Sequence, residues 1–280
     1  MSRLPVGATF GSLVHGVLEH TDPDAPERGG DLAAELRHHL AEQLVRWPVE
    51  LDQDALVDAL VAVCDTPLGP LTGDLTLRRL RLPDRLAELE FELPLDGGDD
   101  RGRVPAGIRL RDLATLLRRH LPEGDPVRAY ADRLDHPALG DQPLRGYLNG
   151  FIDLTLRVDG RYFVCDYKTN WLGAGSPADP EYVLRAHDYA PAALTDAMGH
   201  SDYPLQALLY SLVLHRYLRW RQPGYDPEQH LGGVLYLYLR GMCGPGTPVV
   251  DGHRCGVFSW QPPATLVTAL SDLVDGRGAS

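Results

Sequence analysis

Lysine is almost absent from this sequence, and acidic residues are in excess. Of the 27 lysine and arginine residues, only Lys168 is a lysine, whereas aspartate and glutamate together number 39. The formal net charge of −12 argues against tight, unaided binding of nucleic acid, because a domain that binds it alone normally carries a basic face. It does not exclude a protein to which a partner delivers the nucleic acid. One retained lysine indicates a task that an arginine guanidinium does not perform.

Paired cysteines, long apolar runs and a nucleotide-binding loop are missing as well. Cys64, Cys165, Cys243 and Cys255 form no C-x-x-C pair, which favours free thiols in a reduced compartment over a disulfide framework, zinc or an iron–sulfur cluster. No apolar run reaches the ~18–20 residues of a membrane span, and the N-terminus lacks a basic-then-apolar signal. We therefore expect a soluble, cytoplasmic protein without a membrane partner. The loop G-x-x-x-x-G-K-[ST] is absent, so no ATP-driven motor is expected in this chain.

The first part of the chain has the apolar periodicity of helices. Residues 8–20 are predicted to form one helix, and residues 31–63 form a helical stretch that is interrupted at Trp47-Pro48. We therefore assign residues 1–85 to an N-terminal helical part.

From residue 86 onward, strand patterns appear. Residues 86–95 alternate apolar side chains with glutamates, which predicts a strand with one buried face. Residues 96–145 are expected to form a helical insertion that begins with a surface loop at 96–105. We assign 86–280 to an α/β core, with a mixed central sheet flanked by helices, and expect it to form one integrated domain with the N-terminal helical part.

The most informative segment is a predicted β-hairpin around Asp159-Gly160, the strongest short turn signal in the chain. A two-residue turn at this point sets Asp153 opposite Asp166, and Lys168 lies on the same face of the sheet. Cross-strand carboxylates with Cβ atoms ~4.5–5.5 Å apart repel each other, unless a cation compensates or one of them takes up a proton. The same register predicts five side chains on the opposite, core face: Ile152, Leu154, Leu156, Phe163 and Cys165.

Two acids and a lysine around a hard divalent ion suit phosphodiester hydrolysis. Mg²⁺ prefers oxygen ligands and would resolve the repulsion. Such an ion lowers the pKa of a water and polarises a phosphoryl oxygen, while an ammonium positions the water or offsets charge in the transition state. The alternative is an ordinary strand pair whose charges face solvent. Asp153 and Asp166 lie in otherwise apolar segments, which favours a site; whether it holds one or two ions stays open.

Several motifs resemble one known family. They are similar to the C-terminal nuclease domain of RecB subunits, the nuclease part of the RecBCD helicase–nucleases (exonuclease V), within the PD-(D/E)xK nuclease superfamily. This resemblance spans most of the chain and implies a restriction-endonuclease-like core, whereas the helicase lobes of that family are missing. The motifs are FGSLVHGVLE from Phe10, GFIDL around Asp153, DYKTNWLG from Asp166, YPLQALLYSLVLHRYL over 203–218 and GGVLYLYLRGM from Gly232.

The resemblance implies a set of metal ligands and a catalytic lysine. By matching position, Asp153 and Asp166 become metal ligands and Lys168 the catalytic lysine. His15 matches the family's metal-binding histidine, and the carbonyl of Tyr167 matches its backbone ligand. Read without the family, His15 is an ordinary core or surface histidine.

Further residues are implied to border the site. Gln206 and Tyr210 lie one helical turn apart and would help to orient Lys168 and the DNA; alternatively, they form a second buried face of a helix. Glu88 matches an acid that some relatives place near the metal. Alternatively, it belongs to a solvated acidic strand edge with Glu90 and Glu92.

The implied function is that of a Mg²⁺-dependent DNA exonuclease/endonuclease in double-strand-break processing and recombinational repair. Its partners would be a single DNA strand delivered by a helicase motor, RecC- and RecD-like subunits and RecA. The alternative is a non-catalytic module that docks partner subunits or loads a RecA-type recombinase. Such a module would be expected to lack Asp153, Asp166 or Lys168, and all three are present.

Overall fold

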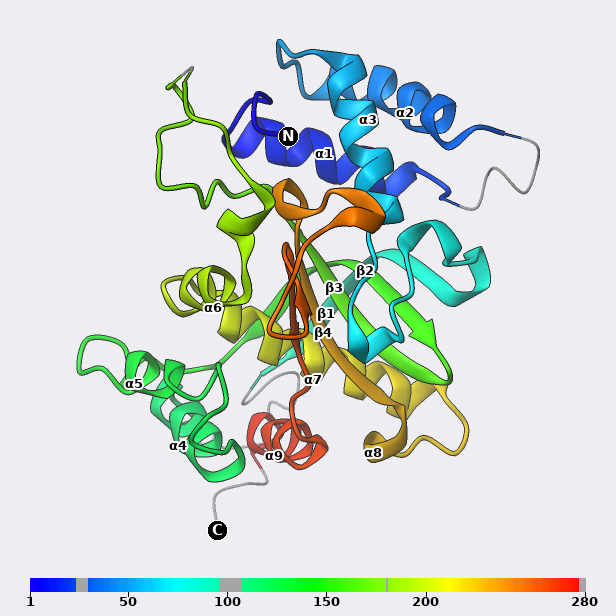
Figure 1. Cartoon of the computed structure of the whole chain (residues 1–280). Coiled ribbons are helices and arrows are strands. Elements are labelled where there is room, and N and C mark those ends of the chain that lie inside the picture. Colours follow the sequence, from blue (N-terminus) through cyan, green and yellow to red (C-terminus); the bar gives the residue numbers. More distant parts are fainter. Residues whose placement is uncertain (24–29, 96–106, 180, 277–280) are drawn as a thin grey trace.

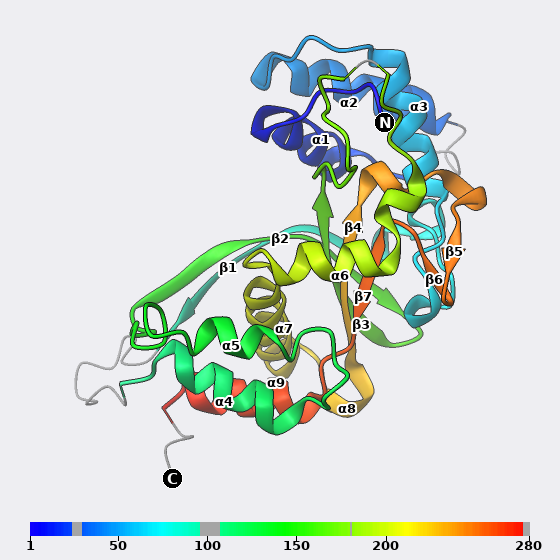
Figure 2. The same cartoon turned by 60° about the vertical axis from the view of Figure 1, so that its left-hand side comes forward.

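A computed structural model describes residues 1–23, 30–95, 107–179 and 181–276, and in them a mixed sheet lies between two layers of helices (Figures 1 and 2). In spatial order, the strands of this sheet are β1 (Arg85–Pro94), β2 (Tyr147–Val158), β3 (Arg161–Lys168), β4 (Leu231–Tyr238) and β7 (Val257–Trp260). Within it β3 and β4 run parallel, and the other neighbours are antiparallel. A separate ladder joins β5 (Val249–Val250) to β6 (His253–Arg254).

Helices from the first part of the chain cover one face of the sheet. They are α1 (Ala8–His20), α2 (Leu32–Arg46) and α3 (Gln53–Asp65), and Figure 2 shows them on the side of the sheet away from α7. Asp31 and Asp52 begin α2 and α3, because each side chain accepts a hydrogen bond from a backbone N–H of the first turn. The apolar stripes of these helices pack against Leu154, Phe163 and Leu235 of the sheet in one core.

The other face of the sheet carries the second layer. The helices there are α4 (Leu110–His120), α5 (Tyr130–Leu134), α6 (Pro191–Gly199), α7 (Tyr203–Arg221) and α9 (Ala264–Val274), and the short α8 (Pro227–His230) precedes β4. Their apolar side chains form a second core with Val164 and Tyr236 of the sheet. Strand β4 is buried at every position, as expected for a strand covered on both faces.

The predicted hairpin is confirmed in its turn and its register. Asp159 and Gly160 have φ of 48° and 79°, the left-handed values that a type I′ turn requires. The ladder pairs Val158 with Arg161, Leu156 with Phe163 and Leu154 with Cys165.

The wider expectations are confirmed in outline. The α/β fold with a mixed sheet is found, and the helices predicted over 8–20 and 31–63 correspond to α1 and to α2 with α3. The insertion contains α4 and α5 with turns between them, whereas the loop predicted at 96–105 lies outside the described residues.

Residues on both sides of residue 85 share one core, which supports the single integrated domain that we propose. All four cysteines are free thiols. Among the described helices, none is long and apolar enough to cross a bilayer.

His215 gives this fold a pH-dependent stability. Its side chain on α7 is 4% exposed, and its Nδ1 lies 2.9 Å from the Tyr225 hydroxyl. Burial lowers the pKa of His215 to about 4, and the charges of Arg219 and Arg216 act in the same direction, against the smaller effect of Asp272. The folded protein therefore excludes a proton that the unfolded chain takes up below its usual pKa of 6.5.

The free energy of unfolding should accordingly be full above pH 6.5 and fall as the pH drops toward 4. His215 should account for a loss of about 2 kcal/mol between pH 7 and pH 5. The variant His215→Gln keeps a hydrogen-bond acceptor for Tyr225. Between pH 7 and pH 5, its free energy of unfolding, measured in urea, should fall by about 2 kcal/mol less than that of the wild type. Equal losses in both proteins would contradict this prediction.

Candidate active site

The buried end of β3 holds an acid against the only lysine. Asp166 is 2% exposed, and Lys168 Nζ lies 2.5 Å from its Oδ2. Burial raises the pKa of Asp166 to about 6, with Asp153 adding to the shift and the Lys168 ammonium opposing it. An acid so far out of water needs a cation beside it.

Lys168 is held by aromatic rings and one amide. Its Nζ lies 4.0 Å from the ring centroid of Tyr203 and 5.2 Å from that of Tyr236. It donates a hydrogen bond of 3.4 Å to Gln206 Oε1, which also accepts one from the Tyr236 hydroxyl. The ammonium therefore has a defined position between α7 and β4.

A chain of hydrogen bonds continues from this amide to β2. Gln206 Nε2 donates to the Tyr210 hydroxyl at 2.9 Å, and that hydroxyl donates to the carbonyl of Phe151 at 2.7 Å. Gln206 and Tyr210 thus tie α7 to the strand that carries Asp153.

His15 reaches the same site from the opposite layer. Its Nε2 lies 2.9 Å from the Tyr167 carbonyl oxygen, and its Nδ1 lies 3.4 Å from Asp153 Oδ2. Burial lowers the pKa of His15, but the hydrogen bond and charge of Asp153 outweigh burial, so that this pKa lies above its usual value. Helix α1 can hold His15 here beside α2 because Gly16 lacks a Cβ, which would lie 2.6 Å from Gln43 Oε1.

The predicted pairing of Asp153 with Asp166 is wrong in one detail. The β2–β3 ladder ends at Leu154 and Cys165, one step before this pair. Asp153 instead accepts a hydrogen bond of 2.8 Å from the backbone N–H of Tyr167. The alternation had predicted that Ile152 and Leu154 share one core. Because β2 leaves the β3 ladder here, Ile152 instead packs in the core on the α7 side, and Leu154 packs in the other core.

Glu88 faces this site from the edge strand. Its φ of 46° departs from strand geometry, at the position between the pairs Ala87–Leu154 and Leu89–Ile152. Burial raises the pKa of Glu88, and the charges of Glu19 and Asp153 raise it further. Non-glycine residues in this conformation are strained and cluster at functional sites.

A cleft of about 530 Å³ opens beside His15 and Glu88, but Asp153, Asp166 and Lys168 do not line it. Its lining also includes Glu19 and, at the end of α2, Arg46 and Trp47. Glu90 and Glu92 do not line it, so the structure separates Glu88 from the rest of the acidic edge.

The donor types here suit a divalent cation, although the ligand atoms of His15, Asp153 and Asp166 do not all lie within 4.8 Å of one another in the described structure. Asp166 is buried with its Oδ2 against Lys168 Nζ at 2.5 Å, and the charge of Asp153 acts on both Asp166 and Glu88. Carboxylate and carbonyl oxygens with one imidazole nitrogen are ligands for Mg²⁺ or Mn²⁺. The structure thus joins His15, Asp153 and Tyr167 by direct contacts. It joins Asp166 to Lys168 and, through Gln206, to Tyr210. The roles of these residues stay predictions.

Tyr203 and Tyr236 were not among the predicted site residues. The signal for Tyr203 is its place one turn before Gln206 on the same helix. Tyr236 is hidden in the apolar run of β4 and pairs with Asp166 only through the parallel register.

A separate group of metal-capable side chains lies on α2. Donor atoms of His38, His39 and Glu42 lie within 4.8 Å of one another in the described structure. His39 also contacts Glu35, and these pairs are three or four residues apart on a helix, where charge pairing is common. We assign no function to them.

Comparison with known proteins identifies the class. Residues 2–250 match the PD-(D/E)XK nuclease superfamily, and the chain belongs to this superfamily. The chain is 58% identical over 277 residues to the RecBCD enzyme subunit RecB of Mycolicibacterium smegmatis, an alignment covering 99% of this chain and 25% of that protein.

Other RecB subunits give the same result. Identity to RecB of Mycobacterium tuberculosis is 55% over 280 residues, covering 98% of this chain and 24% of the relative. Identity to RecB of Escherichia coli is 32% over 274 residues, covering 98% and 20%. The chain therefore spans about a quarter or less of the length of these relatives, and its resemblance to RecB nuclease domains is confirmed.

The hydroxyl of Tyr210 should stabilise the site measurably. In Tyr210→Phe, the Phe151 carbonyl and the Gln206 amide each lose a partner, so the free energy of unfolding should fall by about 1–2 kcal/mol. Urea unfolding measures this change. The matched control is Tyr217→Phe on the same helix, because the Tyr217 hydroxyl makes no hydrogen bond within the described residues. Equal stability of the two variants would contradict the assigned bonds.

Proposed function

We propose that this chain is a Mg²⁺-dependent DNA exonuclease/endonuclease domain of a RecB-like subunit. It would hydrolyse phosphodiester bonds during double-strand-break processing and recombinational repair. Membership of the nuclease superfamily and similarity to RecB support this proposal. The observation that carries it is the buried Asp166–Lys168 pair, next to Asp153 and His15 at one end of the sheet.

The side chains of His15, Asp153 and Asp166 and the Tyr167 carbonyl would hold the ion, or one of two ions. When bound, Mg²⁺ would lower the pKa of a water and offset charge on the phosphoryl group. His15 contacts both the Tyr167 carbonyl and Asp153, and Asp153 accepts a hydrogen bond from the Tyr167 N–H, so these three residues are already close together before an ion binds. This preorganisation lowers the cost of assembling the ligands.

Lys168 would act on the substrate directly. Its ammonium, fixed by Gln206 and the two tyrosine rings, can donate hydrogen bonds to a water or to a phosphate oxygen, and so orient the attack or offset charge in the transition state. Arginine, with its planar guanidinium and longer reach, would not fit the same contacts. This accounts for the single lysine in an arginine-rich chain.

The partners we propose are a DNA strand fed by a helicase motor, RecC- and RecD-like subunits and RecA. The relatives are named as subunits of a RecBCD enzyme. A chain with a net charge of −12 has little affinity of its own for a polyanion, which fits a substrate delivered by the rest of an assembly.

The nuclease activity can be tested on the purified chain. With single-stranded DNA and Mg²⁺, we expect Lys168→Ala and Asp166→Ala to cleave at least ~100-fold more slowly than the wild type, because each removes a preorganised charge from the transition state. EDTA should abolish wild-type cleavage. Arg79→Ala, at an exposed position outside the cleft, should cleave normally. If all four proteins behave alike, the chain is instead a non-catalytic docking module.

Metal binding has a readout independent of cleavage. Mg²⁺ should raise the melting temperature of the wild type, because a ligand that binds only the folded state stabilises it. Asp166→Asn should lose this increase, and its stability without Mg²⁺ should fall, since the Lys168 ammonium loses its buried partner. Differential scanning calorimetry measures both effects. An undiminished Mg²⁺ effect in Asp166→Asn would exclude Asp166 as a ligand.

A further inference from the structure

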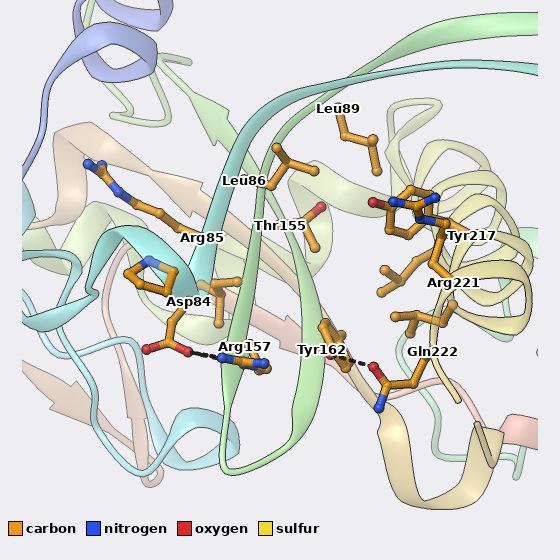
Figure 3. Close-up of a pocket in the computed structure, with 14 residues that line it drawn as sticks. Asp84, Arg85, Leu86, Leu89, Thr155, Arg157, Tyr162, Tyr217, Arg221 and Gln222 are labelled. Atoms are coloured by element: carbon orange, nitrogen blue, oxygen red, sulfur yellow. Dashed lines mark hydrogen bonds and ion pairs between the residues drawn. The ribbon is translucent and has the colours of Figure 1, made fainter. Parts of the chain in front are cut away.

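A second hollow lies on the α7 side of the sheet, beyond the catalytic end. Figure 3 shows it between the strands that carry Leu86, Leu89 and Thr155 and the part of α7 that carries Tyr217 and Arg221. Its volume is about 260 Å³. Leucines form much of its wall, so it can hold a flat, partly apolar group.

Thr155 gives this hollow an unused polar group. Its side chain is 8% exposed, and its Oγ1 is buried without a hydrogen-bond partner in the described structure. In Figure 3 this oxygen points away from the strand, into the space toward α7. A buried hydroxyl without a partner destabilises the fold, and valine would fill the same volume without that penalty. A ligand in the hollow would supply the missing partner.

The charge that remains available at the hollow is positive. Asp84 at its lower edge is paired with Arg157 at 2.7 Å (Figure 3). Arg221 has no acidic partner within the described residues, and its guanidinium lies 4.9 Å from the ring centroid of Trp220. In a chain with a net charge of −12, an unpaired arginine beside a cavity favours an anionic ligand.

One stripe of α7 joins the hollow to the catalytic lysine. Gln206, Tyr210, Leu214, Tyr217 and Arg221 follow one another at intervals of three or four residues, which puts them on one face of the helix. Gln206 contacts the lysine, and Tyr217 and Arg221 line the hollow. The distance from Gln206 to Tyr217 along the helix axis is about 16 Å.

Strands β2 and β3 also connect the hollow with the catalytic end. Thr155 pairs with Val164 of β3, two residues before Asp166. The side chains of Thr155 and Asp166 therefore lie on the same face of the sheet, about 7 Å apart along the strand direction. The hollow and the catalytic end therefore share one face of the sheet.

We propose that the hollow binds one nucleotide of the single DNA strand that is cleaved at Lys168. The base packs between Tyr217 and the leucines, its edge bonds to the Thr155 hydroxyl, and its phosphate pairs with Arg221. A hydroxyl both donates and accepts, so any base is taken, as is usual for stacking sites on single strands. The inference rests on the proposed function, from which it takes the identity of the polyanion.

The test uses the purified chain, a fluorescein-labelled 12-mer of thymidylate and EDTA, so that binding is measured without cleavage. Fluorescence anisotropy at low salt should give a Kd that rises about 10-fold in Tyr217→Ala and about 5-fold in Arg221→Gln and in Thr155→Val. The matched control is Arg219→Gln, two residues away on the same helix and outside the hollow, which should change Kd less than 2-fold, by the loss of non-specific charge alone.

Thermal unfolding separates binding from misfolding. Thr155→Val should melt at the wild-type temperature or above it, because the unpaired hydroxyl is removed. Weaker binding together with full stability then identifies a ligand contact. A structural role alone would lower the melting temperature and leave Kd unchanged, and that result would overturn the proposal.

Two further outcomes would also overturn it. One is a wild type that does not bind the oligonucleotide; the other is wild-type affinity in all three hollow variants. If those variants bind DNA normally but lose a RecC-like subunit in co-purification, the hollow holds an acidic or apolar protein segment instead. If the wild type cleaves DNA in Mg²⁺ and the hollow variants bind DNA normally, this inference is rejected and the proposed nuclease function is not. Binding through the hollow without any cleavage would reject the nuclease function only.

Discussion

The arrangement of this protein depends on one buried ion pair, between Asp166 and the only lysine of the chain. An acid that is 2% exposed pays a desolvation cost of several kcal/mol, and that cost appears in its raised pKa of about 6. The ammonium of Lys168 opposes this shift, but only because it is kept in position by Tyr203, Tyr236 and Gln206. The docking of α7 on the sheet and the parallel pairing of β3 with β4 are therefore conditions for the pair. A displacement of α7 by one turn would take Tyr203 and Gln206 away from the ammonium.

The second layer of the fold adds what the ion pair lacks. Helix α1 comes from the opposite face of the sheet and brings His15 to the Tyr167 carbonyl and to Asp153. At Gly16, α1 packs closely against the Gln43 side chain of α2, and through His15 the N-terminal helices contribute directly to the candidate site. The two hydrophobic cores therefore meet the candidate site from opposite faces of the sheet, one on the side of Lys168 and the other on the side of His15. A site between two layers can keep its acids buried on the sheet and still open through a cleft on one side.

The sequence was sufficient for those parts of the site that local rules determine. The turn at Asp159-Gly160 sets the register, and because side chains alternate along a strand, the register places Asp166 and Lys168 on one face. It was not sufficient at Asp153, because a strand at the end of a ladder can exchange a cross-strand pair for a bond between its side chain and a backbone N–H, which periodicity does not show. Tyr236 was missed for a related reason: it faces Asp166 through a parallel pairing between strands far apart in the chain. The periodicity arguments also left α6, β7 and α9 unassigned, since each is short and spans too few repeats for a clear period.

The charge near two parts of this molecule matters more than its net charge of −12. The overall excess of acids repels a polyanion at long range, and salt screens that repulsion over about 10 Å at 0.1 M ionic strength. Within that distance, local groups decide: the carboxylates around Asp166 invite a cation, and Arg221 stands without an acid beside a hollow on the same helix as Gln206. A polyanion brought to the surface by other means would therefore meet attraction along this helix face. On the proposed function, such a distribution would disfavour DNA that arrives by diffusion and accept DNA that is delivered, and the acidic surface would contribute to the selectivity of the site.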